Sequence, residues 1–217
     1  MTLTRIVGRG RTETITRAAL DGFRAQAERT IIDVGTGDGR YPYALATDHP
    51  DWFVIGIDAL DEPMGELAHK AARKPAKGGR ANVMYLRGAI ESVPDALHDI
   101  ADEVHVMLPW GRLLEGIVIP DPAVINGIAT VAGRVHIVLN GEIWEESLPQ
   151  RFEHLPVPTP EYVGDVIAPA FVAAGVDLEP ARYLSAAEAK SLPTTWARRL
   201  GERRAHPRFV AFDGARR

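Results

Sequence analysis

Short apolar runs rich in β-branched residues alternate along the chain with stretches in which apolar residues recur every three or four positions. The first pattern is typical of buried strands and the second of amphipathic helices. Strands are predicted at residues 30–34, 52–58, 82–86, 102–108, 134–140, 176–184 and 209–212, and helices at 16–28, 42–49, 60–73, 121–132 and 160–174. Residues 5–15 indicate a short N-terminal β-hairpin. The alternation predicts a doubly wound α/β fold with a seven-stranded, mostly parallel sheet and a C-terminal antiparallel hairpin.

The first predicted strand runs into an acid and three alternating glycines, Asp33, Gly35, Gly37 and Gly39. Glycines permit positive φ and leave no Cβ between the main chain and a ligand. The dinucleotide fingerprint G-x-G-x-x-G fails here, because Arg40 stands where its last glycine belongs. The spacing resembles instead the first motif of class I S-adenosylmethionine-dependent methyltransferases, whose Rossmann-like fold uses the acid to anchor the methionine ammonium group. The alternative is an ordinary turn with an N-cap aspartate.

A second acid, Asp58, closes the next predicted strand about twenty residues beyond the glycines, where a carboxylate can accept both ribose hydroxyls. NAD-binding folds share this acid, so Asp58 by itself indicates only a nucleoside cofactor. The glycine spacing then distinguishes S-adenosylmethionine from NAD. Ile90 and Glu91 follow the third predicted strand. The resemblance implies that Ile90 packs on the adenine ring and that Glu91 accepts a polar contact; the alternative for Glu91 is an exposed surface carboxylate.

Length and composition fit one soluble domain over residues 1–217, in which residues 1–29 form a hairpin-and-helix extension. The chain is 46% hydrophobic and 25% charged, and it has no cysteine. Disulfides and thiolate metal sites are therefore excluded, and no metal site is predicted. No apolar run is long enough to cross a bilayer, and the first residues do not resemble a signal peptide. We expect a cytoplasmic monomer without a membrane partner.

The net charge of −4 argues against a nucleic-acid partner, but the basic residues are clustered. One cluster lies within residues 68–87, a second within 196–208, and a third near the N-terminus. Their members are Lys70, Arg73, Lys74, Lys77, Arg80 and Arg87; Arg198, Arg199, Arg203, Arg204 and Arg208; and Arg5, Arg9 and Arg11. These patches predict an RNA-binding surface on an acidic protein.

The fourth predicted strand ends in Leu108-Pro109-Trp110-Gly111. Enzymes that methylate exocyclic amines often place Asn or Asp before this proline, so Leu108 favours a ring nitrogen with a free lone pair, such as adenine N1. Positioning would then supply most of the acceleration. Trp110 and Trp196 are predicted to sandwich a base extruded from its helix, whereas Trp52 and Trp144 are expected in the core.

Four segments in this order, residues 33–39, 70–79, 108–111 and 194–200, resemble the kanamycin–apramycin resistance methyltransferases over nearly the whole chain. That family methylates N1 of adenine-1408 in 16S rRNA. The resemblance implies S-adenosyl-L-methionine as cofactor, S-adenosyl-L-homocysteine as product, and 16S rRNA in the assembled 30S subunit as partner. It implies that Pro109 borders the methyl group and that Trp110 and Trp196 clamp the base. The implied cofactor residues are Asp33, Gly35, Gly37, Asp58, Ile90, Glu91, Leu108 and Thr194; the implied RNA contacts are Arg9, Lys70, Arg73, Lys74, Lys77, Arg80, Arg198, Arg199, Arg203 and Arg204.

One residue departs from the family pattern. Relatives carry Ser or Thr after Pro-Trp-Gly, where this chain has Arg112, which puts full cofactor affinity and full antibiotic resistance in question. Two alternatives stay open. One is a tRNA (guanine-N7) type methyltransferase, which shares the early turn and a basic surface. The other is a non-catalytic protein that binds the cofactor and the ribosome.

Overall fold

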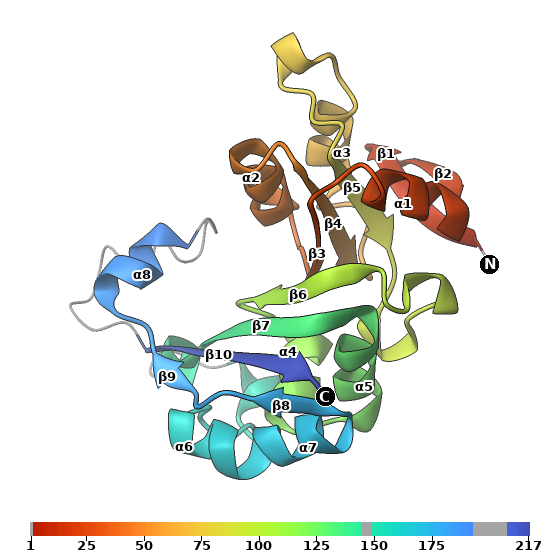
Figure 1. The fold of residues 1–217 in the computed structure, drawn as a ribbon. Coiled ribbons are helices and arrows are strands. Elements are labelled where there is room, and N and C mark those ends of the chain that lie inside the picture. The colour runs from red at the N-terminus through yellow and green to blue at the C-terminus, as the bar shows by residue number, and fades with distance from the viewer. Residues whose placement is uncertain (1, 145–148, 193–207) are drawn as a thin grey trace.

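A computed structural model describes residues 2–144, 149–192 and 208–217, and within them a single mixed sheet of ten strands forms the centre of the molecule (Figure 1). Its middle is a parallel sheet in the order β5-β4-β3-β6-β7. These strands are β3 (Arg29–Val34), β4 (Trp52–Asp58), β5 (Val83–Arg87), β6 (Ala101–Met107) and β7 (Ala132–Asn140). The C-terminal strand β10 (Phe209–Arg216) pairs antiparallel with β7. The predicted α/β class and the antiparallel end of the sheet are therefore confirmed.

The predicted number of seven strands is wrong, for two reasons. The hairpin of β1 (Thr2–Gly8) and β2 (Arg11–Thr16) joins the main sheet, because β1 pairs antiparallel with β5. The single strand predicted over residues 176–184 is divided into β8 (Val176–Leu178) and β9 (Arg182–Tyr183), which both pair with β10. Pro180 lies between them and has no N–H to donate to a sheet ladder.

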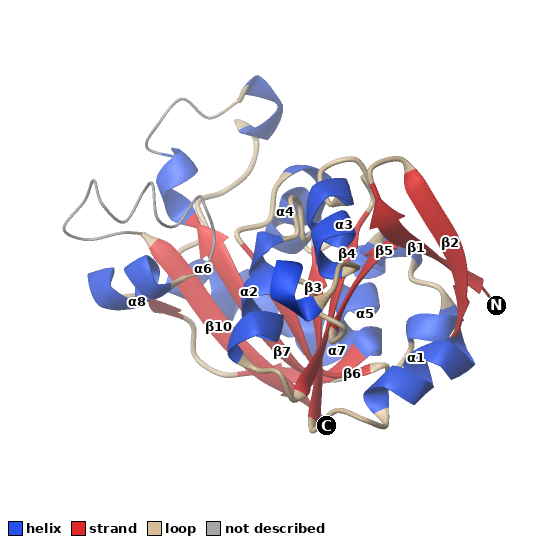
Figure 2. Ribbon diagram, turned by 90° about the horizontal axis from the view of Figure 1, so that it is seen from above, coloured by secondary structure: helices blue, strands red, loops and turns tan. Residues whose placement is uncertain are grey.

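Helices cover both faces of the sheet (Figures 1 and 2). One face carries α2 (Arg40–Asp48), α3 (Gly65–Ala71) and α8 (Ala186–Ser191). The other carries α1 (Arg17–Arg24), α4 (Gly111–Val118), α5 (Pro122–Val131) and the run of α6 (Pro160–Tyr162), a π-helical turn η6 (Val163–Ile167) and α7 (Ala168–Ala173). Short 3-10 turns are η1 (Pro75–Lys77), η2 (Ile90–Ser92), η3 (Asp95–Leu97), η4 (Gly141–Trp144) and η5 (Gln150–Phe152).

Helix ends follow local chemistry. Thr16 caps α1 by accepting from the Ala19 N–H, and Thr159 caps α6 by accepting from the Tyr162 N–H. Gly175, with φ of +85°, follows the end of α7, as predicted. The helix predicted over residues 60–73 is shorter in the structure, where α3 spans only Gly65–Ala71. The sequence did not predict α4 or α8.

The core is layered on the two faces of the parallel strands. In β3, Ile32 and Val34 belong to the large apolar cluster under α4, α5 and α7, whereas Ile31 belongs to the cluster under α2 and α3. Both faces are buried, as expected of parallel strands.

Among the described residues no single helix is long and apolar enough to span a membrane; only α4 and α5 taken together reach that length, and they are bent by 99° at the break between them.

Candidate functional site

A cavity of about 640 Å³ lies at the carboxyl ends of β3, β4 and β6, where open α/β sheets bind their ligands. The residues predicted to hold a cofactor line it from separate segments of the chain. They are Asp33, Gly35 and Gly37 from the first turn, Asp58 from the end of β4, Ile90 and Glu91 from η2, and Leu108 beyond β6. Trp110 lines the same cavity, and the buried Pro109 lies between Leu108 and Trp110. The structure thus brings the predicted residues of the described segments into one place.

The glycine turn is held to the neighbouring strand by its own backbone. The N–H groups of Gly35 and Thr36 donate to the Ile57 carbonyl at 2.9 and 3.2 Å. Gly35 has φ of +73°, and a Cβ there would lie 2.5 Å from Leu113 Cδ2. Gly37 has φ of +56°, and a Cβ there would meet no atom within 4 Å. The turn is therefore bare and open at Gly37, where it lines the cavity.

Asp33 is the buried acid of the site. Only 2% of the residue is exposed, and burial raises its pKa to about 8, with repulsion from the Asp58 carboxylate adding to the effect. A buried carboxylate without a cationic neighbour favours its neutral form. A ligand that brings a positive charge next to Asp33 would reverse this preference, so the site is suited to an ammonium group.

Asp58 holds the glycine turn against the end of β4. Its Oδ2 accepts from the Gly37 N–H at 2.9 Å, and its Oδ1 accepts from the Leu60 N–H at 3.0 Å. An ionised carboxylate has about four lone-pair sites, so both oxygens can still accept from a ligand's hydroxyl groups. The predicted ribose-binding acid is consequently pre-oriented by the main chain.

Glu91 and Ile90 line the cavity on the side of α5. Ile90 is buried against α5, where a Cβ at Gly127 would lie 2.0 Å from the Ile90 carbonyl oxygen. Glu91 Oε1 lies 3.0 Å from the Arg112 Nε. Arg112, the residue that departs from the family pattern, lines the same cavity and pairs with the predicted cofactor residue Glu91. The sequence did not indicate this pairing.

The segment after β6 carries backbone strain. Leu108 has φ of +52°, a left-handed conformation that is uncommon for a residue with a branched side chain, and its N–H donates to the Val138 carbonyl at 2.8 Å. This bend directs the chain over the cavity before α4 begins. Trp110 remains 47% exposed at that point. An exposed tryptophan on a strained segment beside a cavity is suited to stacking on a flat ligand.

Two residues that the sequence did not identify support Trp110. The Phe152 ring lies edge-on to Trp110, with ring centroids 4.9 Å apart, and the Arg151 guanidinium lies 6.0 Å from the Trp110 centroid. Both belong to η5, a short turn in a proline-rich segment. Trp52 and Trp144, which were expected in the core, are only partly buried and pack against the outside of the apolar clusters.

Tyr41 is a further lining residue that the sequence missed. Its hydroxyl lies 2.7 Å from His105 Nδ1, and His105 Nε2 lies 3.0 Å from Glu103 Oε1. Burial lowers the pKa of His105, which favours the neutral imidazole. His105 and Glu103 are two residues apart in β6, a spacing that places side chains on the same face of any strand. Nothing in the local sequence connects them with Tyr41.

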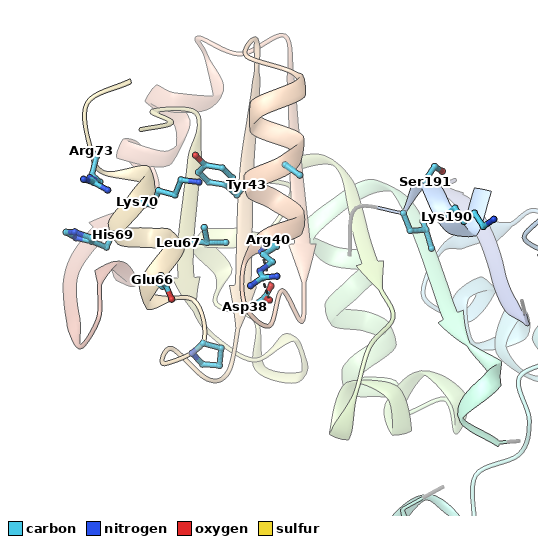
Figure 3. Close-up of a pocket in the computed structure, with 13 residues that line it drawn as sticks. Asp38, Arg40, Tyr43, Glu66, Leu67, His69, Lys70, Arg73, Lys190 and Ser191 are labelled. Atoms are coloured by element: carbon cyan, nitrogen blue, oxygen red, sulfur yellow. Dashed lines mark hydrogen bonds and ion pairs between the residues drawn. The ribbon is translucent and has the colours of Figure 1, made fainter. Parts of the chain in front are cut away.

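The basic residues of the cluster predicted within residues 68–87 lie beside another cleft. Lys70 and Arg73 line a cavity of about 800 Å³ between α2, α3 and the end of α8, and Lys190 lies on its opposite wall (Figure 3). Lys70 Nζ lies 4.4 Å from the centre of the Tyr43 ring. Lys74 and Lys77 are exposed on the loop around η1.

Two predicted RNA contacts are engaged within the protein. Arg80 Nε donates to the Thr47 hydroxyl, and Arg9 pairs with Glu66 at 3.2 Å on the surface. The remaining predictions fall outside the described residues. These are Thr194, Trp196, Arg198, Arg199, Arg203 and Arg204.

A sequence model of the family described as "NpmA: 16S rRNA (adenine(1408)-N(1))-methyltransferase" matches residues 4–214. The chain is 38% identical to a 16S rRNA (adenine(1408)-N(1))-methyltransferase of Streptoalloteichus hindustanus over 213 residues, which is 97% of each protein.

Solved structures agree with this match. The chain is similar to a mutant 16S rRNA (adenine(1408)-N(1))-methyltransferase from Catenulisporales acidiphilia crystallised with the cosubstrate SAM, with a TM-score of 0.89 and 35% identity over 99% of this chain and 96% of the other. It is also similar to the antibiotic-resistance methyltransferase Kmr, with a TM-score of 0.79 and 27% identity over 99% of this chain and all of the other.

Proposed function

The chain belongs to the 16S rRNA (adenine(1408)-N(1))-methyltransferase family, and we propose that it transfers a methyl group from S-adenosyl-L-methionine to N1 of adenine-1408 in 16S rRNA. The observation that carries the proposal is the joint cavity. It places a buried acid, a bare glycine turn, a pre-oriented second acid and an exposed tryptophan around one space at the carboxyl edge of the sheet.

The cavity fits S-adenosyl-L-methionine. Asp33 is a buried carboxylate suited to the methionine ammonium group, and the turn at Gly37 has no side chain between the main chain and the ligand. Asp58 would accept the ribose hydroxyls, while Ile90 and Glu91 would line the adenine. When bound, the cofactor supplies an electrophilic methyl group on a positively charged sulfur. The chain itself then has to orient the acceptor and exclude water.

Trp110 is the residue we assign to the acceptor base. Its exposed ring would stack on an adenine extruded from the rRNA, with Phe152 packed edge-on against it and Arg151 close to it. Adenine N1 carries a free lone pair at neutral pH, so no residue needs to remove a proton before transfer. Leu108 offers no side-chain acceptor for an amine, in keeping with a ring-nitrogen target. The methylated base is cationic, and an aromatic face also favours a cation.

The basic cleft supports docking on structured RNA. Lys70, Arg73 and Lys190 surround a hollow beside the cofactor cavity, and Lys74 with Lys77 extend the basic surface along the η1 loop. Contacts of this kind recognise phosphates and shape, while one base is read in the pocket. We propose that the substrate is the assembled 30S subunit and that a single copy of the chain acts on it. By stereochemical interference at adenine-1408, methylation would confer aminoglycoside resistance.

Transfer of radiolabelled methyl groups tests the proposal. Purified protein is incubated with labelled S-adenosyl-L-methionine and 30S subunits, free 16S rRNA or tRNA, and primer extension locates the modified base. We expect label in 30S subunits and a reverse-transcription stop at adenine-1408. Label in tRNA alone would support the guanine-N7 alternative. Cofactor and subunit binding without any label would support the non-catalytic alternative.

Reversing charges on the η1 loop is expected to weaken subunit binding. A Lys74→Glu, Lys77→Glu double variant loses two cations that can contact phosphates, so the slope of log affinity against log salt should fall by about one for each phosphate that is no longer neutralised. Binding to 30S subunits is measured by filter retention across a salt series. Arg134→Glu is a control that reverses one charge elsewhere, because Arg134 is exposed near the amino end of β7, at the end of the strands opposite the cavity. Equal losses of affinity in both variants would contradict the assigned docking face.

A further inference from the structure

Arg112 connects two parts of the site that are far apart in sequence. It lies in the first turn of α4, two residues after Trp110, and its Nε is 3.0 Å from Glu91 Oε1. Its terminal nitrogen lies 3.8 Å from Asp121 Oδ2. Asp121 is the N-cap of α5 and accepts from the Ala123 N–H at 2.8 Å. The guanidinium is thus placed between the cavity and the start of a second helix.

Glu91 itself has little local support. It lies in η2, a turn of three residues, and a glutamate side chain has three rotatable bonds. Arg112, in contrast, extends from a helix anchored by the buried Leu114 and Ile117. A guanidinium held by a rigid element fixes the direction of a carboxylate that it contacts. The contact engages Oε1, and the second oxygen of a carboxylate can accept from a ligand.

We propose that Arg112 is a positioning residue that sets the selectivity of the cofactor cavity for adenine by holding the Glu91 carboxylate as an acceptor at the end of the cavity. The inference rests on the proposed function, because it assumes that the nucleobase lies beside Ile90 and Glu91. An ionised carboxylate only accepts hydrogen bonds. It therefore matches the exocyclic amine of adenine and opposes the carbonyl oxygen that hypoxanthine carries in the same position.

The exposure of the pair makes the inference testable without unfolding the protein. The Arg112 side chain is 67% exposed and that of Glu91 27%, and exposed ion pairs contribute little to global stability. Loss of Arg112 should therefore leave the fold intact while freeing Glu91 to move. A merely electrostatic or structural role would change the binding of every nucleoside ligand to the same extent.

The experiment compares S-adenosyl-L-homocysteine with S-inosyl-L-homocysteine by calorimetry on the full chain. For Arg112→Met we expect the preference for the adenine ligand to fall about fivefold, which corresponds to a typical net contribution of one hydrogen bond. Arg112→Lys keeps the positive charge but lacks the planar guanidinium group with its several N–H donors. This variant should therefore retain part of the preference for the adenine ligand. In a Glu91→Gln background, Arg112→Met should have no further effect on the ratio.

Arg151→Met is the matched control, because it removes the same charge from the cavity at the Trp110 end. Its ratio of affinities should equal that of the wild type. An unchanged ratio in Arg112→Met would overturn the inference and leave the cofactor assignment standing. If the wild type binds neither ligand, the proposed cofactor and the inference fail together.

Discussion

Replacing Asp33 with Asn is expected to abolish tight cofactor binding and at the same time to stabilise the free protein at alkaline pH. The cofactor's ammonium group would lose a charged partner, and hydrogen bonds to charged groups are worth about 1.5–3 kcal/mol, or roughly 10- to 100-fold in affinity. Binding of S-adenosyl-L-homocysteine by calorimetry measures the loss. Asp38→Asn is the control, because Asp38 is an exposed acid of the same turn that pairs with Arg40.

The stabilising effect follows from the pKa of Asp33, which burial raises from 3.8 to about 8. Between these two values the folded protein keeps a proton that the unfolded chain has released. Stability therefore falls as pH rises through this window, by an amount of the order of a few kcal/mol. The amide of the Asp33→Asn variant is neutral in both states, so the variant would avoid this loss.

Thermal unfolding of the free protein at pH 5 and pH 8.5 checks the direction in which stability changes with pH. We expect the advantage of Asp33→Asn over the wild type to be larger at pH 8.5 than at pH 5. For the wild type, cofactor affinity should rise over the same range, because the ligand's cation favours the ionised carboxylate. An advantage that is equal at both pH values would contradict the role of burial.

Replacing Trp110 with Ala is expected to reduce methyl transfer by roughly 10- to 100-fold while changing cofactor affinity little. Stacking of a base on an aromatic side chain is worth about 1–3 kcal/mol, and the acceptor must also be held in line with the methyl group. Trp110 is 47% exposed, so its removal creates no large cavity in the core. Single-turnover transfer to 30S subunits measures the effect.

Trp110→Phe separates stacking from other roles of the tryptophan. A phenyl ring keeps a flat aromatic face next to Phe152, so this variant should retain a large part of the activity. Trp52→Phe is the control, because Trp52 stacks on His49 at the start of β4, at the opposite edge of the sheet. Full activity of Trp110→Ala would exclude the base-stacking role.

The parallel centre of the sheet was predictable because its signals are local. In β3, buried apolar residues on both sides of the strand precede Asp33 and the glycine turn, and the same holds for β4 and Asp58. The number of strands was not predictable. Pairing of β1 with β5 joins segments about eighty residues apart, and no periodicity reveals which edge a hairpin will join.

The site likewise combines features that local sequence signals predicted with features that depend on long-range packing. Asp33, Asp58, Ile90 and Glu91 come from the ends of consecutive strands, and the topology of an α/β sheet brings such ends together. The pairing of Arg112 with Glu91 and the packing of Phe152 on Trp110 depend on where α4 and η5 lie in space. Helix α4 itself gave a weak signal, since its eight residues contain two glycines.

The two outer edges of the sheet bear on how the protein avoids aggregation. An unpaired edge is a template on which a strand of another molecule can add. On one side the outermost strand, β2, is short and carries the exposed Arg11 and Glu13; on the other, β8 and β9 are interrupted at Pro180. Charge, short length and a missing N–H each disfavour such addition. A wide, open sheet with such edges therefore offers little template for strand addition between two copies of the chain.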